Sequence, residues 1–315
     1  MGGVIGPMSK PAFEPARDIA DLSGKVIIVT GGNTGIGYET VKQLLLKNAK
    51  VYLAARSPDK AATAIQSLEA ETKGKAIFLQ LDLGDLPSVR HAAESFLKQE
   101  QKLDILFNNA GVMNCPTDML TKQGYDLQFG TNVLGHFFFT ELLLLALTKS
   151  YEQSKVPARI ITTSSVGHHA APGSGMDVAS LKGGPERDAW IKKRGFMAAF
   201  SLYGGSKIGN IYIANYWAKT HSDVLVSCSV HPGGIRSELT RHSMSLMQYI
   251  GYLLSWPVSR GALPQLWAAT AATPTQMTGQ YVVPWGVVGQ ADKRAADVKV
   301  ETEMVEYMRE QLKGY

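Results

Sequence analysis

Short runs of β-branched and aliphatic residues alternate with helix-like stretches along most of this chain, and this alternation limits the fold more than any other feature. The runs lie at residues 25–30, 50–55, 76–81, 104–107, 158–163 and 224–230, with a last strand at 278–284. Their continuous hydrophobicity predicts strands buried on both faces, and intervening helices imply right-handed crossovers. We therefore predict an α/β fold: a single doubly wound Rossmann-type domain with about seven parallel strands and helices on both faces.

The sequence predicts a separate segment on each side of the domain. Residues 1–21 are predicted to form an N-terminal arm, and residues 22–290 the domain itself. Residues 291–315 mix Lys and Glu at helical spacing, which predicts a terminal helix on the domain surface. The first 20 residues have no continuous apolar segment, so neither a signal peptide nor an anchor helix is expected.

Charge and cysteine content narrow the function classes. Against 27 acidic side chains there are 32 basic ones, scattered rather than gathered in a stripe, so nucleic acid is not an expected partner. Cys115 and Cys228 lack metal-ligand spacing, so we expect no metal site and no disulfide framework. They are predicted to be reduced, buried thiols in a cytoplasmic protein.

A glycine-rich turn follows the first predicted strand and opens a helix near Ile36. It comprises Gly31, Asn33, Thr34, Gly35, Ile36 and Gly37. Glycines permit a tight turn and close approach of a pyrophosphate to the backbone, and the helix N-terminus supplies N–H donors. The spacing G-x-x-x-G-x-G departs from G-x-G-x-x-G, and a simple strand-to-helix turn remains an alternative.

Residues at three further strand ends fit a dinucleotide site. Arg56 stands where NAD-binding sheets usually carry an acid, and no acid occurs before Asp59, which favours NADP(H); a solvated loop arginine is the alternative. Asp82 and Leu83 can border the adenine or simply cap a turn. The third strand end supplies small residues and amides that can line the cofactor or form a turn: Asn109, Ala110 and Gly111.

Tyr203 and Lys207 stand four residues apart, which puts a phenol and an ammonium on one face of a helix. A nearby positive charge favours the phenolate and lowers the tyrosine pKa from its usual value of about 10. Such a tyrosine can exchange a proton with an alcohol or a carbonyl. The combination predicts a nicotinamide-dependent oxidoreductase.

Taken together, these motifs resemble the short-chain dehydrogenase/reductase family over about residues 22–290. The motifs that carry the resemblance are Thr30–Gly37, Asn108–Gly111, Asn132, Ser165, Tyr203–Lys207 and Pro232–Gly233. Residues 128–137 and His231–Gly233 are most similar to the retinol-dehydrogenase-like and fungal branches.

The resemblance implies a role for each matching residue. Tyr203 would be the general acid or base, Lys207 would lower its pKa and hold the nicotinamide ribose, and Asn132 would hold a relay water. Ser165 would bind the substrate oxygen, with Ser164 left open as the catalytic serine. The residues expected at the nicotinamide and pyrophosphate are Pro232, Gly233, Ile235 and Ser237.

Two segments are expected to shape the substrate site. Between Ser165 and Tyr203 lie 37 residues, more than is usual in this family, which indicates a substrate-side insertion at 166–202 with a short helix around 189–193. Its His168 and His169 can bind substrate or metal, or be surface histidines; the latter is favoured. Its run at 192–194 is expected to be a solvated face. Residues 238–257 are predicted to form a lid; their apolar run at 244–256 can instead be a packed helix or a peripheral membrane contact.

The leading hypothesis is an NADP(H)-dependent oxidoreductase that interconverts a hydrophobic aldehyde or ketone and its alcohol, with a retinoid-, steroid- or terpenoid-like substrate. Such an activity suits secondary metabolism. The alternative is a protein of the same fold that binds NADP(H) as a sensor without turnover. A homodimer or homotetramer is common in the family, and no sequence feature decides between these states.

Overall fold

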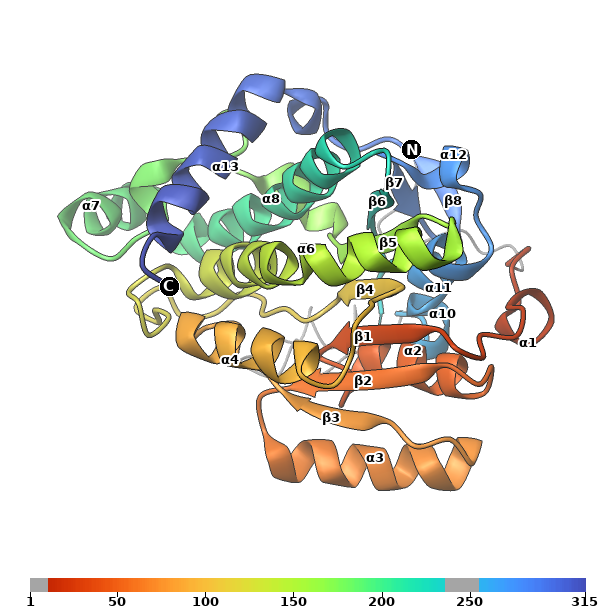
Figure 1. Cartoon of the computed structure of the whole chain (residues 1–315). Coiled ribbons are helices and arrows are strands. Elements are labelled where there is room, and N and C mark those ends of the chain that lie inside the picture. The colour runs from red at the N-terminus through yellow and green to blue at the C-terminus, as the bar shows by residue number, and fades with distance from the viewer. Residues whose placement is uncertain (1–10, 236–254) are drawn as a thin grey trace.

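An eight-stranded sheet runs through the centre of the protein, for which a computed structural model describes residues 11–235 and 255–315 (Figure 1). The strands are β1 (Val26–Thr30), β2 (Lys50–Ala55), β3 (Ile77–Gln80), β4 (Ile105–Asn108), β5 (Ala158–Thr163), β6 (Leu225–Val230), β7 (Tyr281–Val283) and β8 (Val287–Gly289). Their order is β3-β2-β1-β4-β5-β6-β7-β8, and β1 to β7 pair in parallel. The predicted doubly wound fold is confirmed.

The sheet has one strand more than predicted, because β8 returns antiparallel to β7 after a tight turn. Gly286 adopts φ +86° in that turn, a conformation that favours glycine. Val287 and Val288 are exposed, so β8 lacks the buried apolar run that marks the central strands. A hairpin also needs no crossover helix, which removes the second signal used to find strands.

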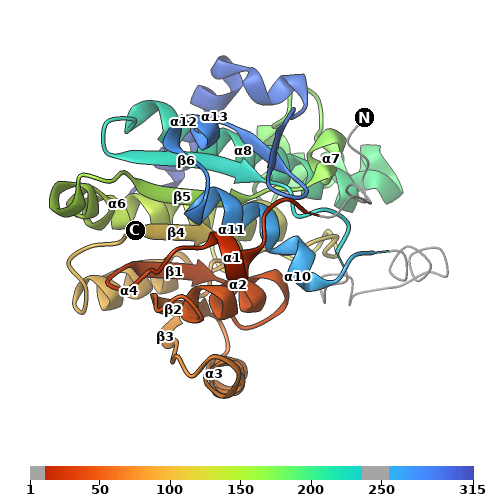
Figure 2. The ribbon, with the colours of Figure 1, turned by 90° about the vertical axis from the view of Figure 1, so that its right-hand side faces the viewer.

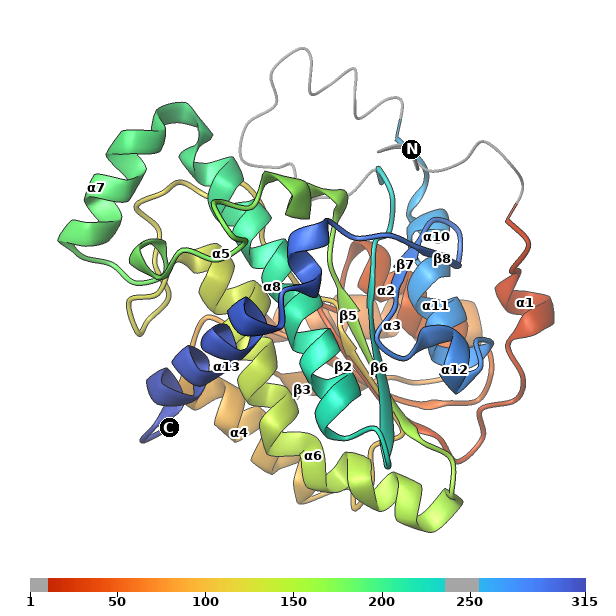
Figure 3. The same ribbon diagram turned by 90° about the horizontal axis from the view of Figure 1, so that it is seen from above.

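Helices cover both faces of the sheet (Figure 3). One face packs against α4 (Leu86–Leu97), α6 (Gly135–Ser154) and α8 (Ala198–Thr220), and α13 (Val298–Leu312) packs on α8. The other packs against α2 (Gly35–Leu45), α3 (Pro58–Thr72) and α11 (Leu263–Thr270). The remaining α-helices among the described residues are α1 (Pro15–Asp18), α5 (Leu127–Phe129), α7 (Pro185–Arg194), α10 (Val258–Gly261) and α12 (Pro274–Met277).

The continuous helical stretch Leu127–Ser154, which ends in α6, is long and apolar enough to cross a membrane by length and composition. Its most apolar window is 72% buried inside the protein. Phe137, Phe139, Leu143 and Leu147 are fully enclosed between the sheet and its neighbouring helices. This burial is that of a central core helix.

The outlying segments are anchored to this core. In the N-terminal arm, α1 lies beside α11 (Figure 2). Phe13 and Ile19 of the arm are buried in the apolar cluster to which α11 contributes. At the other end, α13 buries Met304 and Met308 and lies within residues 291–315, the stretch predicted to form a terminal helix. The lid predicted at 238–257 falls largely outside the described residues, as does Ser237.

The predicted insertion contains short 3-10 turns at Val166–Ala170, Val178–Ser180 and Gly195–Met197, followed by the start of α8. The helix expected around 189–193 is present as α7, at the periphery of the molecule (Figure 1). A buried ion pair fastens it: Nη2 of Arg187 lies 2.8 Å from Oδ2 of Asp126. Lys192 and Lys193 are exposed, as expected for a solvated face.

Candidate active site

The carboxyl ends of β1 and β4 meet where the strand order reverses, and Thr30 joins them. Its Oγ1 donates to the Phe107 carbonyl at 3.1 Å and accepts from the backbone N–H groups of Asn109 and Ala110, each at 2.9 Å. Nε2 of the buried His136 lies 2.9 Å from the same oxygen. These bonds fix the strand ends beside which a dinucleotide binds in doubly wound sheets.

The glycine-rich turn is built for close backbone approach. Gly31 and Gly35 have φ values of +66° and +55°, which L side chains rarely adopt. A Cβ on Gly37 would stand 2.2 Å from the Gly31 carbonyl oxygen and 2.7 Å from Nδ2 of Asn109. The turn leads directly into α2, whose first N–H groups are available to an anion. The three glycines and Asn109 thus form a cradle that fits a pyrophosphate.

Two charged residues predicted to bind the cofactor, at the ends of neighbouring strands, differ in their surroundings. Arg56 follows β2, is exposed, and makes no hydrogen bond or ion pair with any described residue. Asp82 is partly buried, and its Oδ1 accepts from the Gly84 backbone N–H at 3.0 Å. Asp82 therefore caps a turn, one of its two predicted roles, and the Arg56 guanidinium has no hydrogen-bond or ion-pair partner within the described part of the chain. Leu83, the next residue, is buried.

Ser164 and Ser165 have separate roles in the structure. Ser164 is buried, and its hydroxyl donates to the Lys207 carbonyl at 2.7 Å. The Ser165 hydroxyl instead accepts from the Gly167 N–H at 3.1 Å, and the Ser165 side chain is near enough to the Tyr203 phenol to lower its pKa. A Cβ on Gly167 would stand 2.7 Å from Cε1 of Tyr203, so glycine lets this segment pack on the phenol ring. Of the two serines, only Ser165 faces Tyr203.

The electrostatics of Tyr203 and Lys207 differ from the sequence-based expectation. Burial raises the pKa of Tyr203, and the Ser165 side chain acts in the opposite direction without overcoming it. Burial also lowers the pKa of Lys207 to about 7. Its Nζ donates to the Thr163 carbonyl at 2.8 Å and lies 5.8 Å from the centroid of the Tyr203 ring. Lowering of the tyrosine pKa by this lysine is therefore not seen here, because desolvation of both groups dominates.

Asn132 lies in a π-helical turn, Gly130–Leu134, between α5 and α6. Its Oδ1 accepts from the Val112 N–H at 2.8 Å, and its Nδ2 donates to the Ser206 hydroxyl at 2.9 Å. Its carbonyl accepts from Nδ2 of Asn210 at 2.6 Å. Single π turns within helices occur frequently at functional sites. The side chain of Asn132 therefore ties the segment after β4 to α8, the helix that carries Tyr203.

The segment after β6 brings further predicted residues to the cofactor side. Gly233 adopts φ +90°. A Cβ on Gly261 of α10 would stand 2.8 Å from Cγ1 of Ile235 and 3.1 Å from Cδ1 of Ile36. Ile235 therefore lies near the glycine-rich turn, although the two are far apart in sequence. Pro232 lies between β6 and Gly233.

Comparison with known proteins identifies the family. A short-chain dehydrogenase/reductase from Armillaria gallica is 48% identical over 307 residues, which cover 97% of this chain and 96% of that protein. This chain belongs to the short-chain dehydrogenase/reductase family. The family described as short chain dehydrogenase matches residues 25–180. Retinol dehydrogenase 11 of Mus musculus is 41% identical over 74% of this chain and 68% of its own length, which supports the retinol-dehydrogenase-like branch.

Solved structures agree on the fold of this short-chain dehydrogenase/reductase. An uncharacterised protein from Mycobacterium paratuberculosis superposes with a TM-score of 0.70 at 25% identity, covering 95% of this chain and 96% of its own. An NADPH-bound carbonyl reductase from chicken fatty liver superposes with a TM-score of 0.62 at 21% identity. The match covers 86% of this chain and 100% of that chain.

The surface position predicted for His168 is wrong, and two other residues near the site, His231 and Thr30, had no predicted role of their own. His168 was expected at the surface, but it is fully buried, since Tyr281 and the segment at 292–294 cover it. His231 and Thr30 were recognised only as parts of motifs. A polar residue at the last position of an otherwise apolar strand, as at Thr30, was the available signal. Among residues 11–235 and 255–315, no three potential metal ligands come together.

Proposed function

We propose that this oxidoreductase uses NADP(H) to interconvert a hydrophobic aldehyde or ketone and the corresponding alcohol. The observation that carries the proposal is the grouping of Ser165, Tyr203 and Lys207 at the carboxyl end of β5, with the glycine cradle at the carboxyl end of β1 on the other side of β4. Ligands of doubly wound sheets bind at this edge.

In this proposal Tyr203 moves the proton. Its phenol donates a proton to the substrate oxygen during reduction and accepts it back during oxidation. Ser165, whose side chain acts on the phenol, holds the same substrate oxygen. A bound nicotinamide supplies or accepts the hydride at the substrate carbon. Lys207 holds the ribose side of the site, and its pKa of about 7 lets its charge respond to a bound anion.

The preference for NADP(H) rests on Arg56. An exposed guanidinium at the end of β2, without a partner among the described residues, can bind a 2'-phosphate, whereas an acid at this position would hold a ribose 2'-hydroxyl. The residues of the glycine-rich turn would hold the pyrophosphate. The residues present fit this cofactor.

Two observations support the proposal that the substrate is apolar. Relatives include Retinol dehydrogenase 12 of Homo sapiens, which is 38% identical over 84% of this chain and 79% of its own length. In addition, Phe196, Met197 and Phe200 are exposed just before Tyr203 on the chain, and Phe196 is 94% exposed. Such a surface beside the catalytic helix can admit an apolar molecule.

The test is oxidation of NADPH by the purified protein across a panel of apolar aldehydes and ketones, with NADH and Tyr203→Phe in parallel. We expect turnover with NADPH and a fall in kcat of at least about 100-fold in Tyr203→Phe, since the phenylalanine cannot transfer a proton. Full turnover by Tyr203→Phe would remove the assigned proton transfer. Tight NADPH binding without turnover on any substrate would instead support the sensor hypothesis.

A further inference from the structure

The peptide group that joins Ser165 to Val166 is bound at both of its polar atoms by histidine side chains. The Ser165 carbonyl oxygen lies 2.6 Å from Nδ1 of His168. The Val166 N–H donates to Nδ1 of His231 at 3.3 Å. A peptide group fixed at both ends restricts the torsions that aim the Ser165 side chain.

The hydrogen bonds determine the tautomer of His168. Its Nε2 lies 2.9 Å from the Asp292 backbone nitrogen, which can only donate, so Nε2 carries no proton. The ring proton is therefore on Nδ1, which donates to the Ser165 carbonyl. Burial lowers the pKa of His168 to about 4, which keeps the ring neutral at neutral pH.

His231 has the opposite tautomer. Its Nδ1 accepts from two backbone N–H groups, those of Val166 and Gly233, each at 3.3 Å. Its proton therefore lies on Nε2, which is buried without a hydrogen-bond partner among the described residues. Burial lowers the pKa of His231 to about 4 as well. The ring joins the segment that carries Ser165 to the segment that is expected to bracket the nicotinamide.

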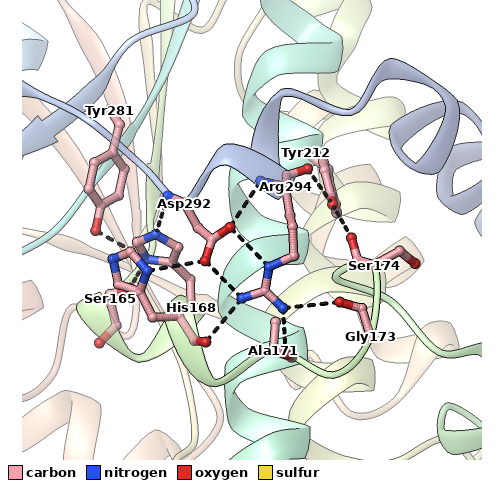
Figure 4. Close-up of polar contacts among 10 residues, drawn as sticks. Ser165, His168, Ala171, Gly173, Ser174, Tyr212, Tyr281, Asp292 and Arg294 are labelled. Atoms are coloured by element: carbon pink, nitrogen blue, oxygen red, sulfur yellow. Dashed lines mark hydrogen bonds and ion pairs between the residues drawn. The ribbon is translucent and has the colours of Figure 1, made fainter.

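A clamp from the C-terminal part of the chain holds His168 in place (Figure 4). Besides the bond from the Asp292 backbone, Arg294 donates to the carbonyls of His169 at 3.0 Å and Ala171 at 2.7 Å. The Asp292 carboxylate pairs with this guanidinium at 2.8 Å. Tyr281 of β7 packs edge-on against the His168 ring, with 5.1 Å between centroids. The histidine is thus held from two elements that follow it by more than 100 residues.

We propose that His168 and His231 are positioning residues that hold the Ser165–Val166 peptide and so aim the Ser165 hydroxyl at Tyr203 and the substrate oxygen. The proposal rests on the function proposed above, in which Ser165 contacts that oxygen. Neither histidine touches the reacting atoms; each acts on Ser165 through the Ser165–Val166 peptide, and His231 also holds the Gly233 N–H.

Matched substitutions separate the bonds of His168. In His168→Asn the amide nitrogen can take the place of Nδ1 and still donate to Ser165, while the bond to Asp292 is lost. In His168→Gln the amide reaches the place of Nε2 and the side-chain bond to the Ser165 carbonyl is lost, while the backbone N–H of residue 168 still donates to that carbonyl. His169→Gln is the control, because His169 is an exposed neighbour that does not bond to Ser165. For His231, Asn can keep an acceptor for Val166, whereas Leu cannot.

The expected result is a selective loss in kcat. His168→Gln and His231→Leu should lower kcat about 10- to 100-fold, while the two Asn variants retain most of the turnover. KM for NADPH should be unchanged in His168→Gln, whereas His231→Leu also loses the bond to the Gly233 N–H. In a Ser165→Ala background His168→Gln should have no further effect, because it acts through Ser165. Equal losses for Asn and Gln at position 168, or additive losses with Ser165→Ala, would overturn the proposal.

Amide hydrogen exchange supplies a readout that does not need turnover. Exchange of the Val166 amide should be about fivefold or more faster in His231→Leu than in the wild type, in His231→Asn or in His169→Gln. Unchanged exchange in His231→Leu would overturn the proposal even if the enzyme were inactive on every substrate. A wild type without turnover, but with the expected exchange pattern, would contradict the proposed function alone.

Discussion

At the residue scale, the adjacent residues Ser164 and Ser165 have different partners because of the backbone geometry. Ser164 and Ser165 follow β5, where successive side chains point to opposite sides. Ser164 therefore points into the protein and holds the Lys207 carbonyl, whereas Ser165 is partly exposed and contacts Tyr203. The choice between these serines, which the sequence left open, follows from that alternation.

Substitution of each serine tests this assignment. We expect Ser165→Ala to lower kcat by about 100-fold, because it removes a hydrogen bond to the substrate oxygen. Ser164→Ala should mainly lower the free energy of unfolding, by about 1 kcal/mol, since it removes a buried hydrogen bond. Steady-state kinetics and urea unfolding of both variants provide the measurement. A larger loss of kcat in Ser164→Ala would contradict the assignment.

Exchange of Arg56 for Asp tests the cofactor preference. The substitution removes a cation that can bind a 2'-phosphate and adds a carboxylate that repels it and can bind a 2'-hydroxyl. The ratio of kcat/KM for NADPH to that for NADH should fall about 10- to 100-fold. Arg56→Lys serves as the matched control, which should keep most of the preference. An unchanged ratio in Arg56→Asp would exclude the role in 2'-phosphate binding.

At the element scale, the passage from β1 into α2 depends on residues that lack side chains. Gly37 lies in the first turn of α2, where its α-hydrogen faces the Gly31 carbonyl and the amide of Asn109. This contact holds the helix N-terminus against the ends of β1 and β4. The same contact directs the N–H groups of α2 toward the place of a pyrophosphate.

Gly37→Ala should disturb this junction. The added Cβ would stand 2.2 Å from the Gly31 carbonyl oxygen, so the turn or the helix must shift. We expect NADPH affinity to fall at least about tenfold and the free energy of unfolding to fall by about 1–3 kcal/mol. Gly74→Ala, where the nearest contact would be 3.3 Å to Leu45, is the control. Fluorescence titration with NADPH measures the affinity, and wild-type affinity would refute the cradle.

At the scale of the whole molecule, Asp104 joins several segments at the end of the sheet that lies opposite the active site. Its buried carboxylate accepts from the Val26 N–H at 2.8 Å and from the Ser150 hydroxyl of α6 at 2.9 Å. Nζ of Lys25 lies 3.2 Å away and that of Lys102 lies 3.0 Å away. Burial acts to raise the pKa of Asp104, but these donors outweigh it and hold the pKa below its ordinary value.

The depressed pKa predicts an acid-sensitive contribution to stability. Because the pKa is lower in the folded than in the unfolded chain, the stabilisation is full above about pH 4 and is lost as the pH falls through the folded value. Asp104→Asn should be less stable by about 2 kcal/mol at neutral pH and should lose less stability on acidification. Denaturant unfolding between about pH 3 and pH 7 measures both. Parallel curves for the two proteins would contradict the prediction.

The sequence alone determined the class of this protein. Continuous apolar runs separated by helical stretches predicted the doubly wound sheet, since strand and helix periodicity are encoded by residues close together in the chain. The order of the motifs predicted the family, and α7 and α13 formed where the local pattern placed them. The central strands, the glycine-rich turn and the tyrosine-lysine pair needed no tertiary information.

The tertiary structure decided burial and partners. His168 is a core residue only because Tyr281 and Asp292 return to cover it, and burial raises the pKa of Tyr203, which its spacing from Lys207 alone would not predict. The edge strand β8 likewise carries little local signal. The common reason is that desolvation and hydrogen bonding depend on segments distant in sequence, which no local pattern records.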